Sequence, residues 1–231
     1  ALLIYPTWIA PWFNKFQPLQ DAEIQQRVSQ LMARSGFTSQ GFYVMDGSKR
    51  SAHANAYFTG FGRSKRVVFY DTLLAQLSPA EVDAVLAHEL GHFKHRHVLK
   101  RIVSLFALSL VGFFALGWLG QQTWFFTGLG VSPNLTGAND ALALLLFMLV
   151  LPLAGTLLGP LMAQLSRRHE FEADAWAVAQ TSSAALSSAL LKLFQDNAAT
   201  LTPDPVYVQF YYSHPPAMER LARLANPSTT P

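Results

Sequence analysis

The chain has 231 residues, of which 51% are hydrophobic and 13% are charged, and its net charge is +3. Average soluble domains carry about 25% charged residues, so the composition favours a membrane protein, and the weak positive charge gives no support for nucleic-acid binding. Because there is no cysteine, disulfides and thiolate metal sites are excluded, and any bound metal must be held by histidines and carboxylates.

The first 13 residues, ALLIYPTWIAPWF, are apolar and carry no charge. They lack the charged start of a signal peptide, and they are shorter than the about 20 residues that span a bilayer. We therefore predict that residues 1–13 are the end of a membrane helix or an interfacial anchor, with Trp8 and Trp12 at the level of the lipid headgroups.

Residues 14–101 have the pattern of one helix, a small sheet and a second helix. An apolar face repeats through residues 20–35 and ends at Gly36, which predicts an amphipathic helix. The stretches GFYVMD, SAHANAYFTG and KRVVFYD are typical of strands, and the last two predict a β-hairpin with a glycine-containing loop. The residues SPAE at 78–81 provide a capping box and a proline at the first helical position, so they predict the start of the second helix.

Residues 102–163 are predicted to form a transmembrane helical hairpin. The stretches 102–120 and 141–163 are uncharged and long enough to span a bilayer. A buried hairpin of a soluble protein is the alternative, and two uncharged runs of this length speak against it. Pro152 and Pro160 are expected to bend the second span.

The charges beside the two spans predict the orientation of the hairpin. Basic residues precede the first span and follow the second, whereas the connecting loop, 121–140, has none. The basic residues are Lys94, Arg96, Lys100, Arg101, Arg167 and Arg168. Cytoplasmic loops are enriched in Lys and Arg, so both outer ends are placed on the cytoplasmic side of a bacterial inner membrane, or of the endoplasmic reticulum if the source is eukaryotic.

The motif HELGH at residues 88–92 lies inside the second predicted helix. His88 and His92 are four residues apart, so their imidazoles point from one helical face and can bind one Zn²⁺. Glu89 lies beside them and can act as a base towards a metal-bound water, whose pKa falls to about 7. Gly91 is expected to keep the floor of the site open.

A catalytic zinc takes three protein ligands, so a third must come from elsewhere in the chain. The best stretch is SRRHEFEADAWA, residues 166–177, in which Glu170 and Asp174 share one helical face and Glu172 points roughly the opposite way. Glu170 as a ligand and Asp174 as the partner of a ligand histidine fit the pattern of metal sites. A solvated acidic face paired with neighbouring arginines is the alternative.

Five stretches of the sequence resemble the CAAX prenyl protease 1 family, the integral-membrane zinc metalloproteases also called type I CAAX endopeptidases. They are LIYPTWIAPWFNKFQPL, DGSKRSAHANAYFTGFGRSKRVVFYDTLL, AVLAHELGHFKHRH, SRRHEFEADAWA and YYSHPPAMERLARL, in this order over nearly the whole chain. The heat-shock membrane protease HtpX shares the histidine motif and an EF-x-AD stretch. The stretch DGSKRSAHANAYFTGFG and the end SHPPAMERL are more similar to the CAAX type.

The resemblance implies a role for each residue of the metal site. It implies His88, His92 and Glu170 as the ligands of a single zinc ion, Glu89 as the catalytic base and Asp174 as support for a ligand.

Three further residues are candidates for contacts with a substrate. Asn55 lies in AHANAYF, whose edge can take a substrate as an added strand, and the resemblance places it beside the cleft. His214 precedes two prolines and is therefore extended, which alone favours a structural role. The resemblance instead puts His214 at the active site, where it can bond to the oxyanion that develops on the scissile carbonyl. Arg220 is a weaker candidate for the same neighbourhood.

The remaining histidines are assigned to the surface. His95 and His97 could form a second metal site, but we favour a solvated face beside the membrane. We expect the same of His53 and His169.

These features predict a mainly α protein with a small antiparallel β-sheet. A zincin-like metalloprotease core, residues 14–101 and 164–225, is interrupted by the hairpin and followed by a disordered tail, residues 226–231. The expected reaction is hydrolysis of peptide bonds by a metal-activated water at a membrane. The substrate implied by the resemblance is a CAAX-type C-terminal peptide with a prenylated cysteine.

Three other functions are alternatives to this reaction. A role in membrane-protein quality control, like that of HtpX, is the first alternative. A zinc carrier or sensor would not need Glu89 and would favour ionisable groups inside the spans, and an inactive scaffold would not need a complete set of ligands. Full members of the resembled family have seven membrane helices around a chamber, so a chain with two full spans is expected to be a fragment or a short relative.

Overall fold

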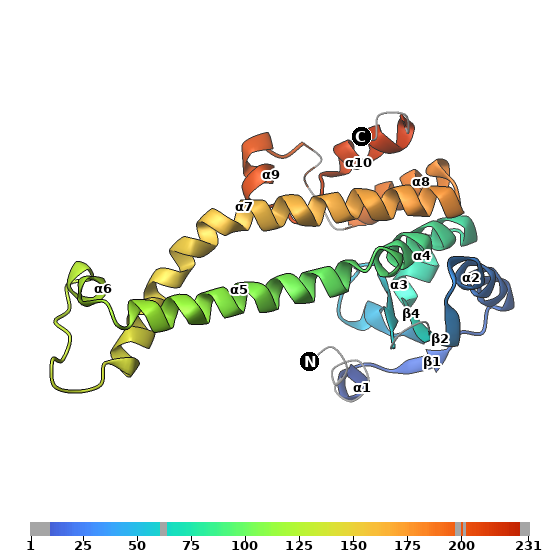
Figure 1. Ribbon diagram of the computed structural model, residues 1–231. Helices are drawn as coiled ribbons and strands as arrows, with labels where there is room; N and C mark the ends of the chain where they lie inside the picture. The colour runs from blue at the N-terminus through green and yellow to red at the C-terminus, as the bar shows by residue number, and fades with distance from the viewer. Residues whose placement is uncertain (1–9, 61–63, 197–199, 201, 227–231) are drawn as a thin grey trace.

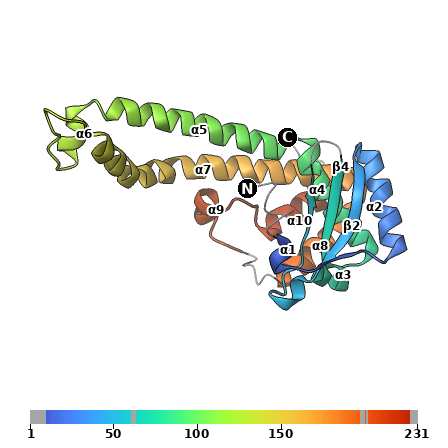
Figure 2. The same ribbon diagram turned by 90° about the horizontal axis from the view of Figure 1, so that it is seen from below.

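A long helical hairpin extends from the part of the molecule that contains the β-sheet and most of the other helices (Figure 1 and Figure 2). In this computed structural model, residues 10–60, 64–196, 200 and 202–226 are described. The hairpin consists of α5 (His97–Leu119) and α7 (Asp140–Gln180), with α6 (Thr123–Gly128) at its tip. Of the predicted anchor, residues 1–9 lie outside the described part, and Trp12 is exposed in the short helix α1 (Ala10–Phe13).

The sheet has four strands in the order β1-β2-β4-β3. The strands are β1 (Phe16–Pro18), β2 (Thr38–Met45), β3 (Ala56–Thr59) and β4 (Ser64–Tyr70). β3 and β4 form the predicted antiparallel pair, but β2 and β4 are parallel, so the prediction of a purely antiparallel sheet is wrong. The reason is that the β3–β4 pair joins the rest of the sheet through β4, and β4 runs in the same direction as β2. Alternation of apolar residues identifies a strand but not its neighbour.

Helices pack around this sheet to form one hydrophobic core. Its largest fully buried side chains include Leu31, Met32, Phe69, Leu73, Leu86 and Leu186. The amphipathic helix predicted at residues 20–35 is α2 (Ala22–Ser35), and Gly36 ends it in the left-handed conformation with φ 81°. The other helices are α3 (Asp71–Gln76), α4 (Pro79–Lys94), α8 (Ser183–Asp196), α9 (Pro205–Tyr211) and α10 (Ala217–Ala225), and a 3₁₀ turn, η2, covers Gly47–Lys49.

The hairpin helices expose their apolar side chains. Both are long and apolar enough to cross a membrane, and the most apolar stretch of α5 has none of its residues buried, against 11% for that of α7. A core hairpin of a soluble protein would bury these side chains, so the structure does not support that alternative. The axis of α7 bends in the yellow part of the ribbon, the region of Pro152 and Pro160 (Figure 1).

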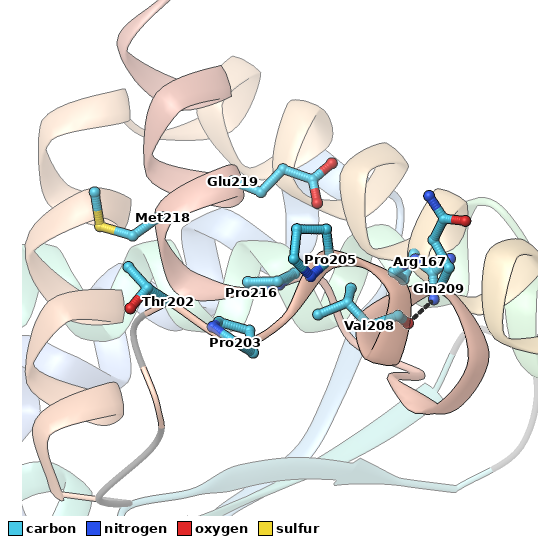
Figure 3. A pocket seen from close by; sticks show the side chains of 9 residues that line it. All are labelled: Arg167, Thr202, Pro203, Pro205, Val208, Gln209, Pro216, Met218 and Glu219. Carbon is cyan, nitrogen blue, oxygen red and sulfur yellow. Dashed lines mark hydrogen bonds between the residues drawn. The ribbon is translucent and has the colours of Figure 1, made fainter.

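Helix α9 is held against α7 by Arg167. Its Nη1 atom donates hydrogen bonds to the backbone oxygens of Val208, at 2.9 Å, and Tyr212, at 2.6 Å. Figure 3 shows Arg167 and Val208 at one end of a cavity of about 520 Å³, which Pro216 of the segment before α10 also lines. Arg167 therefore fixes the chain just before His214.

The predicted capping box starts α4 and also ties it to α8. The Ser78 side chain accepts a hydrogen bond from the backbone of Glu81, and the Glu81 carboxylate accepts one from the backbone of Ser78. The buried Glu81 carboxylate also accepts from Ser188 Oγ at 2.6 Å and Lys192 Nζ at 2.7 Å. Burial acts to raise the pKa of Glu81, but the bonds from Lys192 and Ser188 outweigh it and lower the pKa to about 2.

We predict that Glu81→Gln lowers the free energy of unfolding by about 1–3 kcal/mol at pH 7. The folded-state pKa lies below the ordinary value of 4.5, so the ionised carboxylate stabilises the fold above pH 4.5, and this contribution is lost as the pH falls towards about 2. Urea unfolding in detergent at pH 7, 5 and 3 should show the parent and the variant converging. Glu23→Gln, at an exposed position of α2, is the control and should change stability by less than about 0.5 kcal/mol. A difference independent of pH would contradict the assignment.

Candidate metal centre

The candidate site lies where α4 crosses α7. At the crossing, a Cβ atom added to Gly91 would lie 3.0 Å from Cα of Ala173 and 3.2 Å from its carbonyl oxygen. Gly91 therefore permits close packing of the two helices, rather than keeping the floor of the site open. The close approach brings the HELGH motif of α4 against the EFEAD stretch of α7, although about 80 residues separate them in the sequence.

Three side chains converge at this crossing. His88 and His92 from α4 and Glu170 from α7 each offer one ligand atom, and these atoms lie within 4.8 Å of one another. The two Nε2 atoms are 3.1 Å apart, and each lies 3.5 Å from an oxygen of Glu170. The structure thus brings together the three predicted ligands as a group that could hold a metal ion.

Asp174 and Arg220 lie behind His88. Nδ1 of His88 is 2.8 Å from Oδ1 of Asp174, and Arg220 donates two hydrogen bonds to the same carboxylate, from Nε at 2.8 Å and Nη2 at 2.5 Å. Bonding at Nδ1 orients the ring so that Nε2 faces His92 and Glu170. Arg220, predicted as a weak candidate for substrate binding, is buried and directs these bonds to Asp174.

The surroundings favour positive charge at His88. Burial acts to lower the pKa of His88, but hydrogen bonds to Asp174 and Glu170 outweigh it and raise the pKa to about 9. The same carboxylates stabilise a proton or a metal cation at this position. Burial also acts to raise the pKa of Glu170, yet hydrogen bonds with His214 and His88 hold it well below its ordinary value, so Glu170 is ionised.

Burial shifts the pKa values of His92 and Glu89 in opposite directions, and both directions suit a metal hydrolase. Burial, assisted by the charge of His88, lowers the pKa of His92 to about 4, so its ring is neutral at pH 7 and a nitrogen lone pair is available. Burial raises the pKa of the Glu89 carboxyl above its ordinary value, which makes Glu89 a stronger base.

The site opens into a cavity of about 180 Å³. His88, Glu89 and Glu170 line it together with all three predicted substrate-contact residues, Asn55, His214 and Arg220. His214 is 68% exposed, and its Nδ1 atom lies 3.2 Å from an oxygen of Glu170. Asn55 precedes β3, one of the two edge strands, and its carbonyl oxygen accepts a hydrogen bond from the backbone of Tyr70 at 2.9 Å.

The interpretation of His97 as a solvated residue is wrong. His97 is only 5% exposed; its Nδ1 atom lies 2.9 Å from Nδ1 of His92, and its Nε2 atom lies 2.9 Å from an oxygen of Glu172. His95 is only partly buried, in agreement with the interpretation as a surface residue. Residue spacing does not indicate the contact between His97 and His92, because His97 lies five residues after His92 and beyond the end of α4. Arg96 reverses the chain there, with a positive φ of 57°.

Comparison with known proteins assigns the chain to a family. The profile of Peptidase family M48 matches residues 18–228. The chain belongs to peptidase family M48. This membership confirms the metallopeptidase family expected from the sequence, and the site geometry agrees with it.

Proteins named CAAX prenyl protease 1 are similar to the chain over most of its length. The homolog of Arabidopsis thaliana is 38% identical over 224 residues, which cover 95% of this chain and 51% of the relative. The protein of Saccharomyces cerevisiae is 37% identical over 242 residues, and the human homolog is 33% identical over 261 residues. These alignments cover 97% and 96% of this chain and 52% and 54% of the relatives.

A crystal structure of S. mikatae Ste24p has the same fold, with a TM-score of 0.85 and 36% sequence identity. The match covers 97% of this chain and 55% of that chain. The resemblance to the CAAX prenyl protease 1 family is therefore confirmed, and the chain spans about half the length of the relatives it matches.

We predict that Gly91→Ala destabilises the protein. The higher helix propensity of alanine favours the variant by about 1 kcal/mol, but overpacking against the Ala173 backbone costs about 1–3 kcal/mol, so the net loss reaches about 2 kcal/mol. Gly112→Ala is the matched control, because a Cβ atom there meets nothing within 4 Å. Thermal unfolding in detergent measures both variants, and a Gly91 variant as stable as the Gly112 variant would show that α4 and α7 are not closely packed.

Proposed function

We propose that the chain is a membrane-embedded zinc metalloendopeptidase. The observation that carries the proposal is the grouping of ligand atoms from His88, His92 and Glu170 within 4.8 Å, with Glu89 lining the same cavity. Membership of peptidase family M48 supports hydrolysis of peptide bonds. A zinc carrier or sensor would not require a base beside the ligands.

The donor set fits zinc. Zinc in proteins prefers tetrahedral sites with bonds of about 2.0–2.1 Å to nitrogen, which place the donor atoms about 3.3 Å from one another. The 3.1 Å between the two Nε2 atoms is close to this value, and each Nε2 atom lies 3.5 Å from a different oxygen of the Glu170 carboxylate. Two imidazoles and one carboxylate are the three protein ligands of several catalytic zinc sites. Zinc held by these residues would polarise a substrate carbonyl and lower the pKa of water to about 7.

Glu89 transfers the proton in the proposed reaction. Its carboxylate accepts a proton from the attacking water as the water oxygen bonds to the peptide carbonyl carbon. Glu89 then gives this proton to the amine nitrogen as the carbon–nitrogen bond breaks. The raised pKa of Glu89 suits both steps, because the carboxyl group must be a sufficient base first and hold the proton until the amine leaves.

The cavity has groups that can hold a peptide at this position. β3 is an edge strand, so an extended substrate can add to it, and Asn55 at its start can bond to the substrate backbone. His214 lines the same cavity and can donate a hydrogen bond to the oxyanion that develops on the carbonyl. Asp174 and Arg220 keep the ring of His88 in place.

Similarity to proteins named CAAX prenyl protease 1 supports a CAAX-type C-terminal peptide, with a prenylated cysteine, as the substrate. The matched stretch includes the whole candidate site and about half of those proteins. Quality control of membrane proteins is the second candidate, and it is favoured if cleavage does not depend on the prenyl group.

We propose that α5 and α7 cross the bilayer as a hairpin and that the core, residues 14–101 and 164–225, lies on the cytoplasmic side. The support is the exposed apolar surface of both helices and the absence of Lys and Arg from residues 121–140. Substrate would then reach the site at the membrane surface, where a prenylated C-terminus is expected to lie.

Glu89→Gln tests the reaction. The glutamine side chain keeps the shape of the site but cannot accept the proton, so we expect cleavage to fall by about 10²–10⁴-fold while zinc content stays at one per chain. Zinc is measured by atomic absorption on purified chain, and cleavage by mass spectrometry of a peptide with a farnesylated CAAX end. His92→Ala is the control that should lose zinc as well as activity.

The same peptide without the farnesyl group separates the two substrate classes. Cleavage of the farnesylated peptide alone supports CAAX processing, and equal cleavage of both favours quality control. Zinc in the parent with no cleavage of either peptide would overturn the proposed activity of this chain.

Single cysteines test the predicted orientation, because the chain has none of its own. Leu135→Cys lies in the exposed loop between the spans, and Gln26→Cys lies on the exposed side of α2. We expect a membrane-impermeant maleimide to label Leu135→Cys on intact bacterial cells and Gln26→Cys only after the membrane is opened. The cysteine-free parent is the blank, and the reverse labelling pattern would contradict the orientation.

A further inference from the structure

Both histidines of the proposed zinc site have their Nδ1 atoms engaged, but by different partners. For His88 the partner is Asp174 at 2.8 Å. For His92 the partner is the buried His97, with 2.9 Å between the Nδ1 atoms, and Nε2 of His97 lies 2.9 Å from Oε2 of Glu172. The chain of contacts from His92 through His97 to Glu172 has no role in the mechanism described above.

Only one arrangement of protons fits this chain if His92 binds zinc through Nε2. A neutral histidine that offers the Nε2 lone pair carries its proton on Nδ1. His92 is then the donor to His97, whose Nδ1 must accept. A neutral His97 that accepts at Nδ1 carries its proton on Nε2 and donates it to the Glu172 carboxylate.

We propose that His97 and Glu172 are positioning residues that fix the tautomer and ring orientation of the zinc ligand His92. The inference rests on the proposed zinc site. It adds a second pair of supporting residues to Asp174 and Arg220, which support His88. Partners of this kind make a ligand imidazole more basic and hold its ring in the orientation for metal binding.

Neighbouring side chains hold the pair in place. The ring of His97 stacks on that of His169, with 4.1 Å between centroids and an interplanar angle of 12°. The other oxygen of Glu172 lies 3.3 Å from Nε of Arg168. Each of the two proposed zinc-binding histidines is thus supported by a carboxylate that contacts an arginine. His88 contacts its carboxylate directly, whereas His92 contacts its carboxylate through His97.

A second metal site is the competing use of the same residues. Ligand atoms of His95, His97 and Glu172 lie within 4.8 Å of one another. If a metal bound Nε2 of His97, the proton on Nε2 would have to leave. Because Nδ1 of this ring accepts a hydrogen bond from His92 and carries no proton either, the ring would become an imidazolate anion. The observed contacts at 2.9 Å on both nitrogens favour the positioning role.

Zinc affinity of the purified full chain, measured by competition with a chromogenic chelator, tests the proposal. His97→Phe keeps the ring but removes the acceptor, and we expect zinc affinity to fall about 10–100-fold. His97→Asn keeps an oxygen near the position of Nδ1, so its loss should stay under about 10-fold and below that of the Phe variant. Equal zinc affinity of His97→Phe and the parent would overturn the proposal.

Glu172 gives a second test that does not alter the core, because it is only half-buried on α7. Glu172→Leu should weaken zinc binding, and Glu172→Gln, which keeps an acceptor oxygen, should weaken it less. Thermal unfolding of the metal-free chain shows whether His97→Phe folds. If it does not, the two Glu172 variants test the proposal in its place, and zinc affinities equal to that of the parent in both would overturn it.

Two controls separate this inference from the other possibilities. His95→Ala should bind one zinc with the affinity of the parent, whereas two zinc ions in the parent and one in this variant would show a second metal site and overturn the positioning role. His92→Ala must lose zinc if the proposed catalytic site is correct. Zinc retained by His92→Ala would refute that site, whereas zinc lost from it with full affinity in His97→Phe would refute only the role of His97.

Discussion

Helices α4 and α7 approach closely because Gly91 has no side chain at their crossing, and the candidate metal site depends on this approach. Two of the predicted ligands come from one helix and the third from the other, so the separation of the helices sets the distance between the imidazoles and the Glu170 carboxylate. The capping box of α4, its ion pair with α8 and the hydrophobic core behind it hold the first helix in place.

The site combines several buried charges that would be unfavourable alone. Glu170, Asp174 and Arg220 are all buried, and a buried carboxylate without partners costs several kcal/mol. Here Asp174 is shared between Arg220 and His88, while Glu170 faces the imidazoles. The hydrogen bonds satisfy the charges, and they also restrict the rings to the orientation in which their Nε2 atoms converge.

Much of the fold and of the site could be predicted from local patterns. Helical periodicity indicated α2, the capping box indicated α4, and the four-residue spacing of His88 and His92 placed both on one face. Sheet topology was not predictable in this way, since no local signal says that β4 lies between β2 and β3. The contact between His92 and His97 was missed because it depends on the left-handed conformation of Arg96, a residue type that rarely adopts it. Asp174 was identified because it shares a helical face with Glu170.

Helix α7 is continuous from its apolar part to the residue that completes the site. Glu170 lies ten residues after Pro160, about 15 Å along the helix, with no loop between them to absorb movement. If α7 crosses the bilayer as proposed, a change in its tilt to match the thickness of the lipid would move Glu170 relative to His88 and His92, which belong to α4. In the proposed arrangement, the thickness of the bilayer would therefore affect the distance between Glu170 and the two histidines of the candidate metal site.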